Sequence, residues 1–198
     1  RVVLEGPIAS GQNVAHRGED QRAGEIVLRA GTLLDPAALA MLATVGVDPV
    51  PSFVLPTVCV VPTGDELVAP SDAPPDGGRI RESNGTLLAA QVRRVSPAFR
   101  PFRPGIARDR LDSIHAYLDV GLGHDVLVLS GGVSMGDLDL VGVALRERGM
   151  EILVEKVSIK PGKPLLFGRV RRPEGGVTYV FGLPGNPVSS FVTFEIFV

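Results

Sequence analysis

Residues 125–139, with the sequence DVLVLSGGVSMGDLD, decide the fold of this chain. The stretch opens with a short continuous apolar run, of the kind carried by a strand that is buried on both faces of a parallel sheet. Glycines and serines follow, then the carboxylates of Asp137 and Asp139, and then apolar residues at helical spacing. A strand, a glycine loop and a helix start in this order point backbone N–H groups at an anion. The stretch therefore predicts an anion-binding loop within an α/β fold.

The two carboxylates of this stretch allow two interpretations. Carboxylates beside an anion-binding loop suggest a divalent cation that bridges protein and ligand oxygens. The plainer interpretation is a tight turn from strand to helix, in which Asp137 or Asp139 caps the helix. The stretch by itself leaves both interpretations open.

The composition is that of a globular protein and argues against several classes of function. The 198 residues are 44% hydrophobic and 21% charged, and the formal net charge of -2 gives no sign of a nucleic-acid-binding surface. No apolar run is long enough to span a bilayer. The single cysteine, Cys59, excludes an intrachain disulfide, and its apolar surroundings favour a core residue over a nucleophile.

The chain divides into two parts with different patterns. Residues 1–55 hold two short strand candidates, at 2–4 and 25–28, and one short helix that begins with an Asp-Pro pair. From residue 56 onward strands and helices alternate, which favours a mostly parallel sheet covered by helices. We therefore expect a partial β-rich linker domain over residues 1–55 and an α/β domain over residues 56–198.

Some elements of the second part are less regular than others. Asp109 is a plausible N-cap for a helix that ends near residue 121. Residues 96–105 carry three prolines, so this segment is at best an edge strand. Strand-like runs follow at residues 152–154, 157–159, 165–167 and 177–181.

Four loops carry polar groups that suit one kind of ligand. Residues 63–66 offer a hydroxyl and two carboxylates, and residues 130–139 offer N–H groups, two hydroxyls and two carboxylates. Residues 156–163 offer three ammonium groups, and residues 182–189 offer a helix start with asparagine and serine side chains. Together these groups suggest a phosphate-bearing substrate and metal-assisted group transfer.

The lysines of the third loop form a candidate oxyanion site. If residues 156–160 are extended, Lys156, Ser158 and Lys160 share one face. Lys163 lies beyond a Pro-Gly turn and can return to the same region. Ammonium groups this close repel one another unless an anion lies among them. The alternative interpretation is a solvated strand edge.

Several motifs in this order resemble the molybdenum insertase family, whose members are MoeA-type molybdopterin molybdenumtransferases and the C-terminal region of gephyrin. The motifs are VVPTGDEL at 60–67, SGGVSMGDLD at 130–139, KVSIKPGKP at 156–164 and GLPGNPVS at 182–189, with GQNV at 11–14 and RGED at 17–20 before them. Relative to that family, an N-terminal part and a C-terminal β-domain are absent. The sequence also begins with Arg1 rather than Met, so we expect a fragment of a longer protein.

The resemblance implies a fold and an activity. The fold is a three-layer molybdopterin-binding α/β fold with a mostly parallel sheet, preceded by part of a small β-rich domain. The activity is insertion of molybdate into adenylylated molybdopterin with release of AMP, assisted by Mg²⁺ or another divalent cation. A cytoplasmic homodimer with a small-molecule pterin substrate is implied, together with a possible molybdopterin adenylyltransferase partner and neither nucleic-acid nor membrane partners.

The resemblance also implies roles for individual residues. The cation would be held by Asp65, Glu66 and Asp139. The catalytic residues would be Glu66, Asp109, Asp139, Lys156 and Lys160. The substrate-binding residues would be Asp20, Thr63, Gly64, Ser130, Gly131, Gly132, Ser134, Lys163, Pro184, Gly185, Asn186 and Ser189.

Two other functions remain as alternatives to the insertase. One is a binding or scaffold module that holds molybdopterin or a protein partner without turnover. The retained lysines favour the enzyme, because a scaffold has no need of them. The other is a related adenylyltransferase domain with the same sheet fold, against which residues 1–55 and the Lys-Pro-Gly-Lys segment argue.

Overall fold

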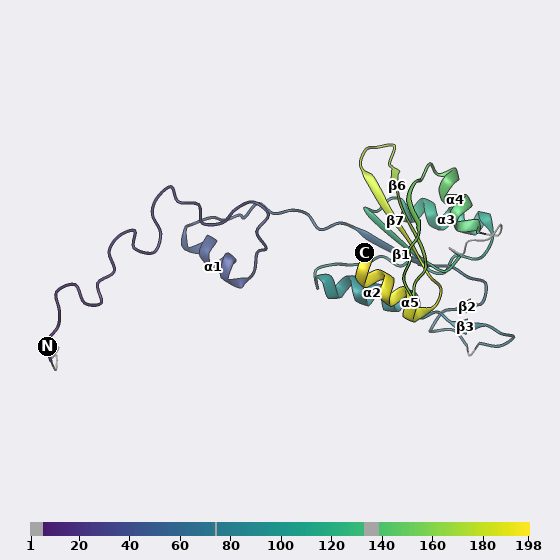
Figure 1. The fold of residues 1–198 in the computed structure, drawn as a ribbon, viewed down its shortest axis with the longest axis horizontal. Coiled ribbons are helices and arrows are strands. Elements are labelled where there is room, and N and C mark those ends of the chain that lie inside the picture. The colour runs from purple at the N-terminus through teal and green to yellow at the C-terminus, as the bar shows by residue number, and fades with distance from the viewer. Residues whose placement is uncertain (1–5, 74, 133–138) are drawn as a thin grey trace. The chain divides into compact units, whose positions relative to one another are not determined.

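The computed structural model describes residues 6–73, 75–132 and 139–198. The chain separates into two compact units, Arg1–Phe53 and Val54–Val198 (Figure 1). The first unit contains helix α1 (Pro36–Thr44), which begins as the sequence predicts. The side chain of Asp35 accepts a hydrogen bond from the backbone N–H of Ala38 (2.8 Å), and a proline occupies the first turn.

The predicted strand at residues 25–28 is wrong. Residues 6–53 include no strand, and Ile26 in the middle of the predicted one is 68% exposed. A strand needs a neighbour that pairs with its backbone N–H and C=O groups, and no segment described in this unit provides one. The strand predicted at residues 2–4 lies outside the described residues.

The second unit is an α/β fold built on a five-stranded sheet. Across the sheet the strands follow the order β1 (Val58–Pro62), β4 (Val126–Ser130), β7 (Val177–Leu183), β6 (Pro164–Arg171) and β5 (Glu151–Lys156). The first three are parallel, and β6 is antiparallel to both of its neighbours. The sheet is therefore mixed. Because β5 and β7 both oppose β6, they run in the same direction.

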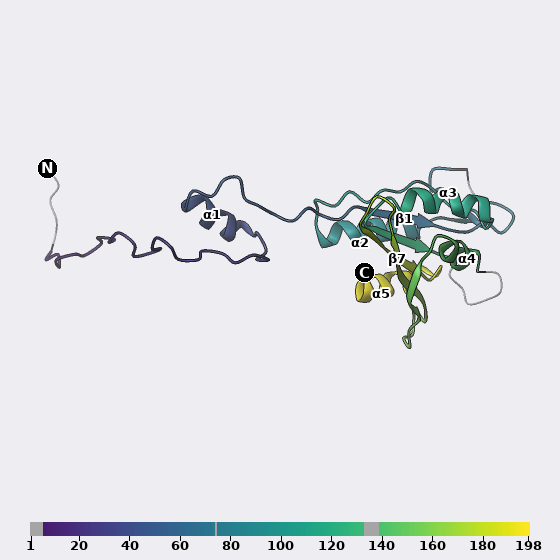
Figure 2. The same ribbon diagram turned by 90° about the horizontal axis from the view of Figure 1, so that it is seen from above.

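Helices cover both faces of this sheet and complete three layers (Figures 1 and 2). On one face lie α3 (Leu111–Gly121) and α4 (Leu140–Glu147), and on the other lie α2 (Asn84–Val95) and α5 (Pro187–Phe197). Within the described residues, none of these helices combines the length and the apolar character that crossing a bilayer requires.

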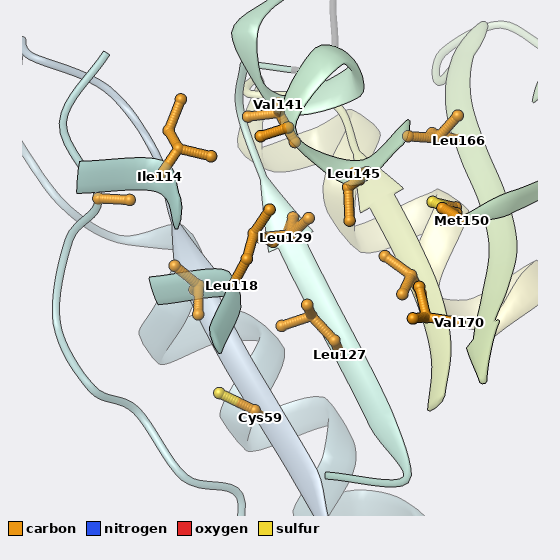
Figure 3. Packing of buried hydrophobic residues seen from close by; sticks show 14 residues of the cluster. Cys59, Ile114, Leu118, Leu127, Leu129, Val141, Leu145, Met150, Leu166 and Val170 are labelled. Atoms are coloured by element: carbon orange, nitrogen blue, oxygen red, sulfur yellow. The ribbon is translucent and has the colours of Figure 1, made fainter. Parts of the chain in front are cut away.

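Alternate side chains of the central strands belong to hydrophobic cores on opposite faces of the sheet. Figure 3 shows Leu127 and Leu129 of β4 on the side of α3 and α4, where they meet Leu118 and Leu145. Successive side chains of a strand point to opposite faces, so the intervening Val128 joins the core under α2 and α5. This double burial explains why the strand is apolar throughout rather than alternating.

Cys59 lies in the core under α3 and is completely buried. Burial raises the pKa of its thiol to about 11, so the thiolate that a nucleophile requires does not form at neutral pH. The sequence-based prediction of a core cysteine is confirmed.

The proline-rich segment runs beside β1 at the edge of the sheet. The N–H of Phe102 donates to the carbonyl of Val58 (2.8 Å), and the N–H of Val60 donates to the carbonyl of Phe102 (2.9 Å). Only isolated bridges form there, because proline has no N–H to contribute to a ladder. The predicted edge segment is confirmed.

Two local predictions are wrong. Helix α3 has Arg110 as its N-cap residue, without a side-chain cap, so Asp109 does not cap it. The strand predicted at residues 157–159 does not form, because β5 ends at Lys156. Beyond that point the chain turns back, and the N–H of Val157 donates to the carbonyl of Lys163 (3.2 Å). The extended backbone that would place the lysines on one face is therefore absent.

Candidate active site

Three loops start from one edge of the sheet. Pro62 at the end of β1 is in register with Ser130 at the end of β4, which is in register with Leu183 at the end of β7. Open α/β sheets bind ligands at the carboxyl ends of their parallel strands. Because β5 runs in the same direction as β7, the lysine-bearing turn that follows it leaves from this edge as well.

A cleft of about 730 Å³ opens at this edge. It brings together ten of the residues that the sequence predicted for the site: Thr63, Gly64, Glu66, Asp109, Ser130, Gly131, Gly132, Asp139, Pro184 and Gly185. Its remaining walls are mostly apolar and come from Leu67, Ile80, Asn84, Ile114, Leu140, Val141 and Pro164. The small parallel pair β2 (Leu67–Val68) and β3 (Ile80–Arg81) contributes two of these residues.

The glycines after β4 are required by close contact with Thr63. Gly131 has a φ of +88°, and a Cβ there would lie 2.6 Å from the carbonyl oxygen of Thr63. Gly132 has a φ of +63°, and its Cβ would lie 2.6 Å from Oγ1 of Thr63 and 2.8 Å from Val141. Only glycine combines this left-handed backbone with such close approach. The loop thus lies directly against the end of β1.

Thr63 lines the cleft and carries a buried hydroxyl. The residue is 3% exposed, and within the described ranges its Oγ1 has no hydrogen-bond partner. Buried hydroxyls are almost always hydrogen-bonded. A hydroxyl can both donate and accept, so this one suits an oxygen or nitrogen of a bound molecule.

Asp65, which does not line the cleft, and Asp109, which does, hold each other in place. The N–H of Asp65 donates to Oδ2 of Asp109, and the N–H of Asp109 donates to Oδ1 of Asp65, both at 3.1 Å. Each carboxylate keeps further lone pairs. Arg108 fixes the same loop, because its Nη1 donates to the carbonyls of Gly64 (3.2 Å), Asp65 (3.3 Å) and Leu67 (2.8 Å).

Asp139 is the N-cap of α4. Its Oδ1 accepts from the N–H of Gly142 (2.9 Å), as the plainer of the two sequence interpretations predicts. Burial raises the pKa of this carboxyl above its ordinary value, although the hydrogen bond from Gly142 and the charge of Arg146 oppose the shift. Asp139 also lines the cleft, so capping and ligand binding are compatible.

The raised pKa of Asp139 has a consequence for stability. The folded state keeps this proton at pH values where the unfolded chain has lost it, so the group's contribution falls as pH rises from the ordinary carboxyl pKa through the raised folded pKa. Asp139→Asn removes this dependence. We expect the free energy of unfolding of the variant minus that of the wild type to be larger at neutral pH than in acid. Denaturant titrations across this pH range measure it, and a difference that grows toward acid would contradict the shift.

The lysines and the start of α5 lie outside the wall of the cleft. Lys156, Lys160 and Lys163 are exposed and are followed by Pro164, which does line it. Asn186 caps α5, and its Oδ1 accepts from the N–H groups of Val188 (3.0 Å) and Ser189 (3.2 Å). The helix thereby begins right after Gly185 at the cleft.

The proposed cation ligands are only partly assembled. Among the described residues, no three of histidine, cysteine, aspartate and glutamate are grouped closely enough to hold a metal ion. Ser134 and Asp137 lie outside the described residues. Asp20 belongs to the first unit, where it lines a separate hollow of about 540 Å³. Asp65 and Asp109 are joined only through the hydrogen bonds between the backbone N–H of each and the carboxylate of the other.

Two polar residues of the site were missed in the sequence. Asn84 lines the cleft at the start of α2, and Arg108 clamps the loop that follows β1. A polar residue at a helix start is typical of a cap, and one arginine among several is typical of a solvated face. Neither residue therefore carried a distinguishing signal.

Comparison with known proteins now decides the family. Residues 59–198 match the family described as "Probable molybdopterin binding domain". The chain belongs to this family. Residues 1–46 match the "MoeA N-terminal region (domain I and II)". The resemblance predicted from the motifs is confirmed.

Relatives and solved structures agree with this assignment to the molybdopterin-binding domains. The chain is 34% identical to a molybdopterin molybdenumtransferase of Staphylococcus aureus (strain COL), over 97% of this chain and 44% of that protein. It is 36% identical to gephyrin of Dictyostelium discoideum, over 100% of this chain and 30% of that protein. The structure matches a molybdopterin biosynthesis MoeA protein of Pyrococcus horikosii with a TM-score of 0.72 and 31% identity, covering 90% of this chain and 42% of that one. The chain thus spans less than half the length of these relatives.

Proposed function

We propose that this chain forms the substrate-binding core of a molybdopterin molybdenumtransferase, which inserts molybdate into adenylylated molybdopterin and releases AMP. The observation that carries the proposal is the cleft at the carboxyl ends of β1, β4 and β7. It combines a glycine loop, carboxylates and an apolar wall. That combination suits a flat heterocycle with an anionic tail. The names of its relatives supply the substrate class.

The chain's own groups would divide the work along the cleft. The start of α5 beside Gly185 and the exposed lysines after β5 would attract the phosphates and molybdate, since a helix N-terminus and ammonium groups both favour anions. Thr63 and Asn84 would orient the substrate, and the apolar wall would limit water around the reacting phosphate. Glu66 and Asp139, which also line the cleft, would contact the phosphate-bearing end of the substrate.

A divalent cation fits part of this arrangement. Mg²⁺ is commonly held by one or two carboxylates together with substrate phosphates and waters. Asp65 and Asp109, whose carboxylates each accept from the backbone N–H of the other residue, would hold the ion, with substrate oxygens completing its coordination. When bound, the ion would neutralise charge on the departing phosphate. The homodimer, the adenylyltransferase partner and the cytoplasmic location stay predictions.

The test follows AMP release by the full protein supplied with adenylylated molybdopterin, molybdate and Mg²⁺. We expect release to depend on molybdate and Lys160→Ala to lower it by about 10²-fold, because a group that stabilises developing charge is removed. The matched control is Arg171→Ala, which removes an exposed cation from the far end of β6. Equal activity of the two variants would contradict the oxyanion role of Lys160.

A molybdopterin-binding module without turnover is the second candidate, and the gephyrin relative motivates it. The same assay separates the two. Tight binding of the pterin without AMP release under any metal condition would favour the binding module. An adenylyltransferase is disfavoured by the match of residues 1–46 to the MoeA N-terminal region.

A further inference from the structure

Asn84 joins the two glycine loops of the cleft. Its Nδ2 donates to Oγ of Ser130 (2.7 Å) at the end of β4 and to the carbonyl of Gly185 (2.7 Å) after β7. The two loops are close there, because a Cβ on Gly185 would lie 3.6 Å from Cα of Gly131. One side-chain amide therefore bridges the two loops across this part of the cleft.

These contacts fix the orientation of the amide. A backbone carbonyl can only accept, so the nitrogen of Asn84 must face Gly185, and Oδ1 must face the other way. Oδ1 is shielded from solvent and has no hydrogen-bond partner in the part of the chain that the structure describes. An unpaired buried carbonyl costs about 1–3 kcal/mol. Because Asn84 lines the cleft, a ligand bound there is a candidate donor to this oxygen.

The backbone around Asn84 is fixed independently of any ligand. Glu82, which is 2% exposed, accepts a hydrogen bond from the N–H of Gly85 and forms an ion pair with Arg103 (3.0 Å). These contacts anchor the first turn of α2. Asn84 thus presents Oδ1 from a rigid position, which is the arrangement that a specific hydrogen bond to a ligand requires.

We propose that Oδ1 of Asn84 accepts a hydrogen bond from a ring N–H or exocyclic amino group of the bound heterocycle. This inference rests on the proposed function, in which the substrate carries both a pterin and an adenine. Both rings have such donors. Phosphate and molybdate oxygens are acceptors, so an acceptor at this position disfavours them there. Asn84 therefore belongs to the subsite for the heterocycle rather than to the subsite for the oxyanions.

The experiment measures binding to the full protein by isothermal titration calorimetry. The probes are 6-hydroxymethylpterin, AMP and inorganic molybdate. We expect Asn84→Ala to weaken binding of one heterocyclic probe by about tenfold, the loss of one hydrogen bond from a buried site. Loss for the pterin alone places the pterin at Oδ1, and loss for AMP alone places the adenine there. Molybdate affinity should change by less than about twofold, because no hydrogen bond to it is removed.

The matched control is Gln91→Ala on the same helix. Gln91 lies seven residues further along α2, is 4% exposed, and donates from Nε2 to the carbonyl of Phe191 (3.1 Å) and to Glu195 (2.9 Å). Its Oε1 also lacks a partner among the described residues, but it does not line the cleft. We expect Gln91→Ala to lower the melting temperature and to leave all three affinities unchanged.

Two results would overturn the proposal in distinguishable ways. If the wild type binds a heterocycle and Asn84→Ala binds it equally well, or if all three affinities fall together, Asn84 is a structural bridge only. If the wild type binds neither heterocycle, the pterin-substrate function fails, and the role of Asn84 fails with it.

Discussion

Asp139→Asn is expected to lower molybdate-dependent AMP release by about 10²-fold or more while the melting temperature changes little. Asparagine caps helices as well as aspartate does, so the hydrogen bond from Gly142 to the cap should persist. The substitution removes one carboxylate from a side chain that lines the cleft. The change therefore separates the chemical role of Asp139 from its structural one.

A second N-cap provides the matched control for this charge. Asp35 caps α1 in the first unit through the same type of contact. Asp35→Asn should leave both stability and AMP release near wild-type values. Asp139→Ala should in addition lower the free energy of unfolding by about 1 kcal/mol, through loss of the cap. Full turnover by Asp139→Asn would show that Asp139 only caps α4.

The sequence predicted the centre of the fold well because two independent signals agree there. The apolar run before Ser130 required burial on both faces, and α2 and α5 cover one face while α3 and α4 cover the other. The glycines after that run predicted a loop between the strand and the helix, and Gly131 and Gly132 there do have positive φ. Where both periodicity and turn chemistry point to one structure, tertiary context has little to change.

Local pattern failed where tertiary partners decide the outcome. Residues 25–28 resemble a strand by composition, but no strand forms without a neighbour to pair with. Asp109 has the side chain of an N-cap, yet it instead exchanges hydrogen bonds with Asp65, which is 44 residues away. Neither the missing partner nor the distant one is visible in a window of ten residues.

The motifs predicted the loops of the site. They did not predict the side-chain hydrogen bonds that hold these loops in place. Motifs supplied the loops that end β1, β4 and β7, and strand order brought them to one edge. Asn84 joins the loops after β4 and β7, and Arg108 fixes the loop after β1; both lie outside the motifs from which the site was predicted. Their role follows from geometry, because Arg108 contacts backbone carbonyls and Asn84 contacts one as well, and a backbone carbonyl leaves no signal in residue type.

Gly131→Ala is expected to lower the free energy of unfolding by roughly 2–5 kcal/mol and to abolish ligand binding in the cleft. Alanine at a φ of +88° is strained, at about 1–2 kcal/mol. Its Cβ would also lie 2.6 Å from the carbonyl oxygen of Thr63. This oxygen belongs to the backbone directly after β1, so it cannot move aside as a flexible side chain would. The loop must therefore shift away from the cleft floor.

Gly185→Ala is the matched control for stability, because both glycines line the same cleft. A Cβ on Gly185 would meet only Cα of Gly131 at 3.6 Å, an ordinary contact, and Gly185 has no positive φ. Its free energy of unfolding should change by less than about 1 kcal/mol. Chemical denaturation of both variants, with titration of AMP, measures the contrast. If Gly131→Ala were as stable as Gly185→Ala, the loop after β4 would have space for a Cβ at residue 131. The close contact with Thr63 would then not determine the shape of the cleft.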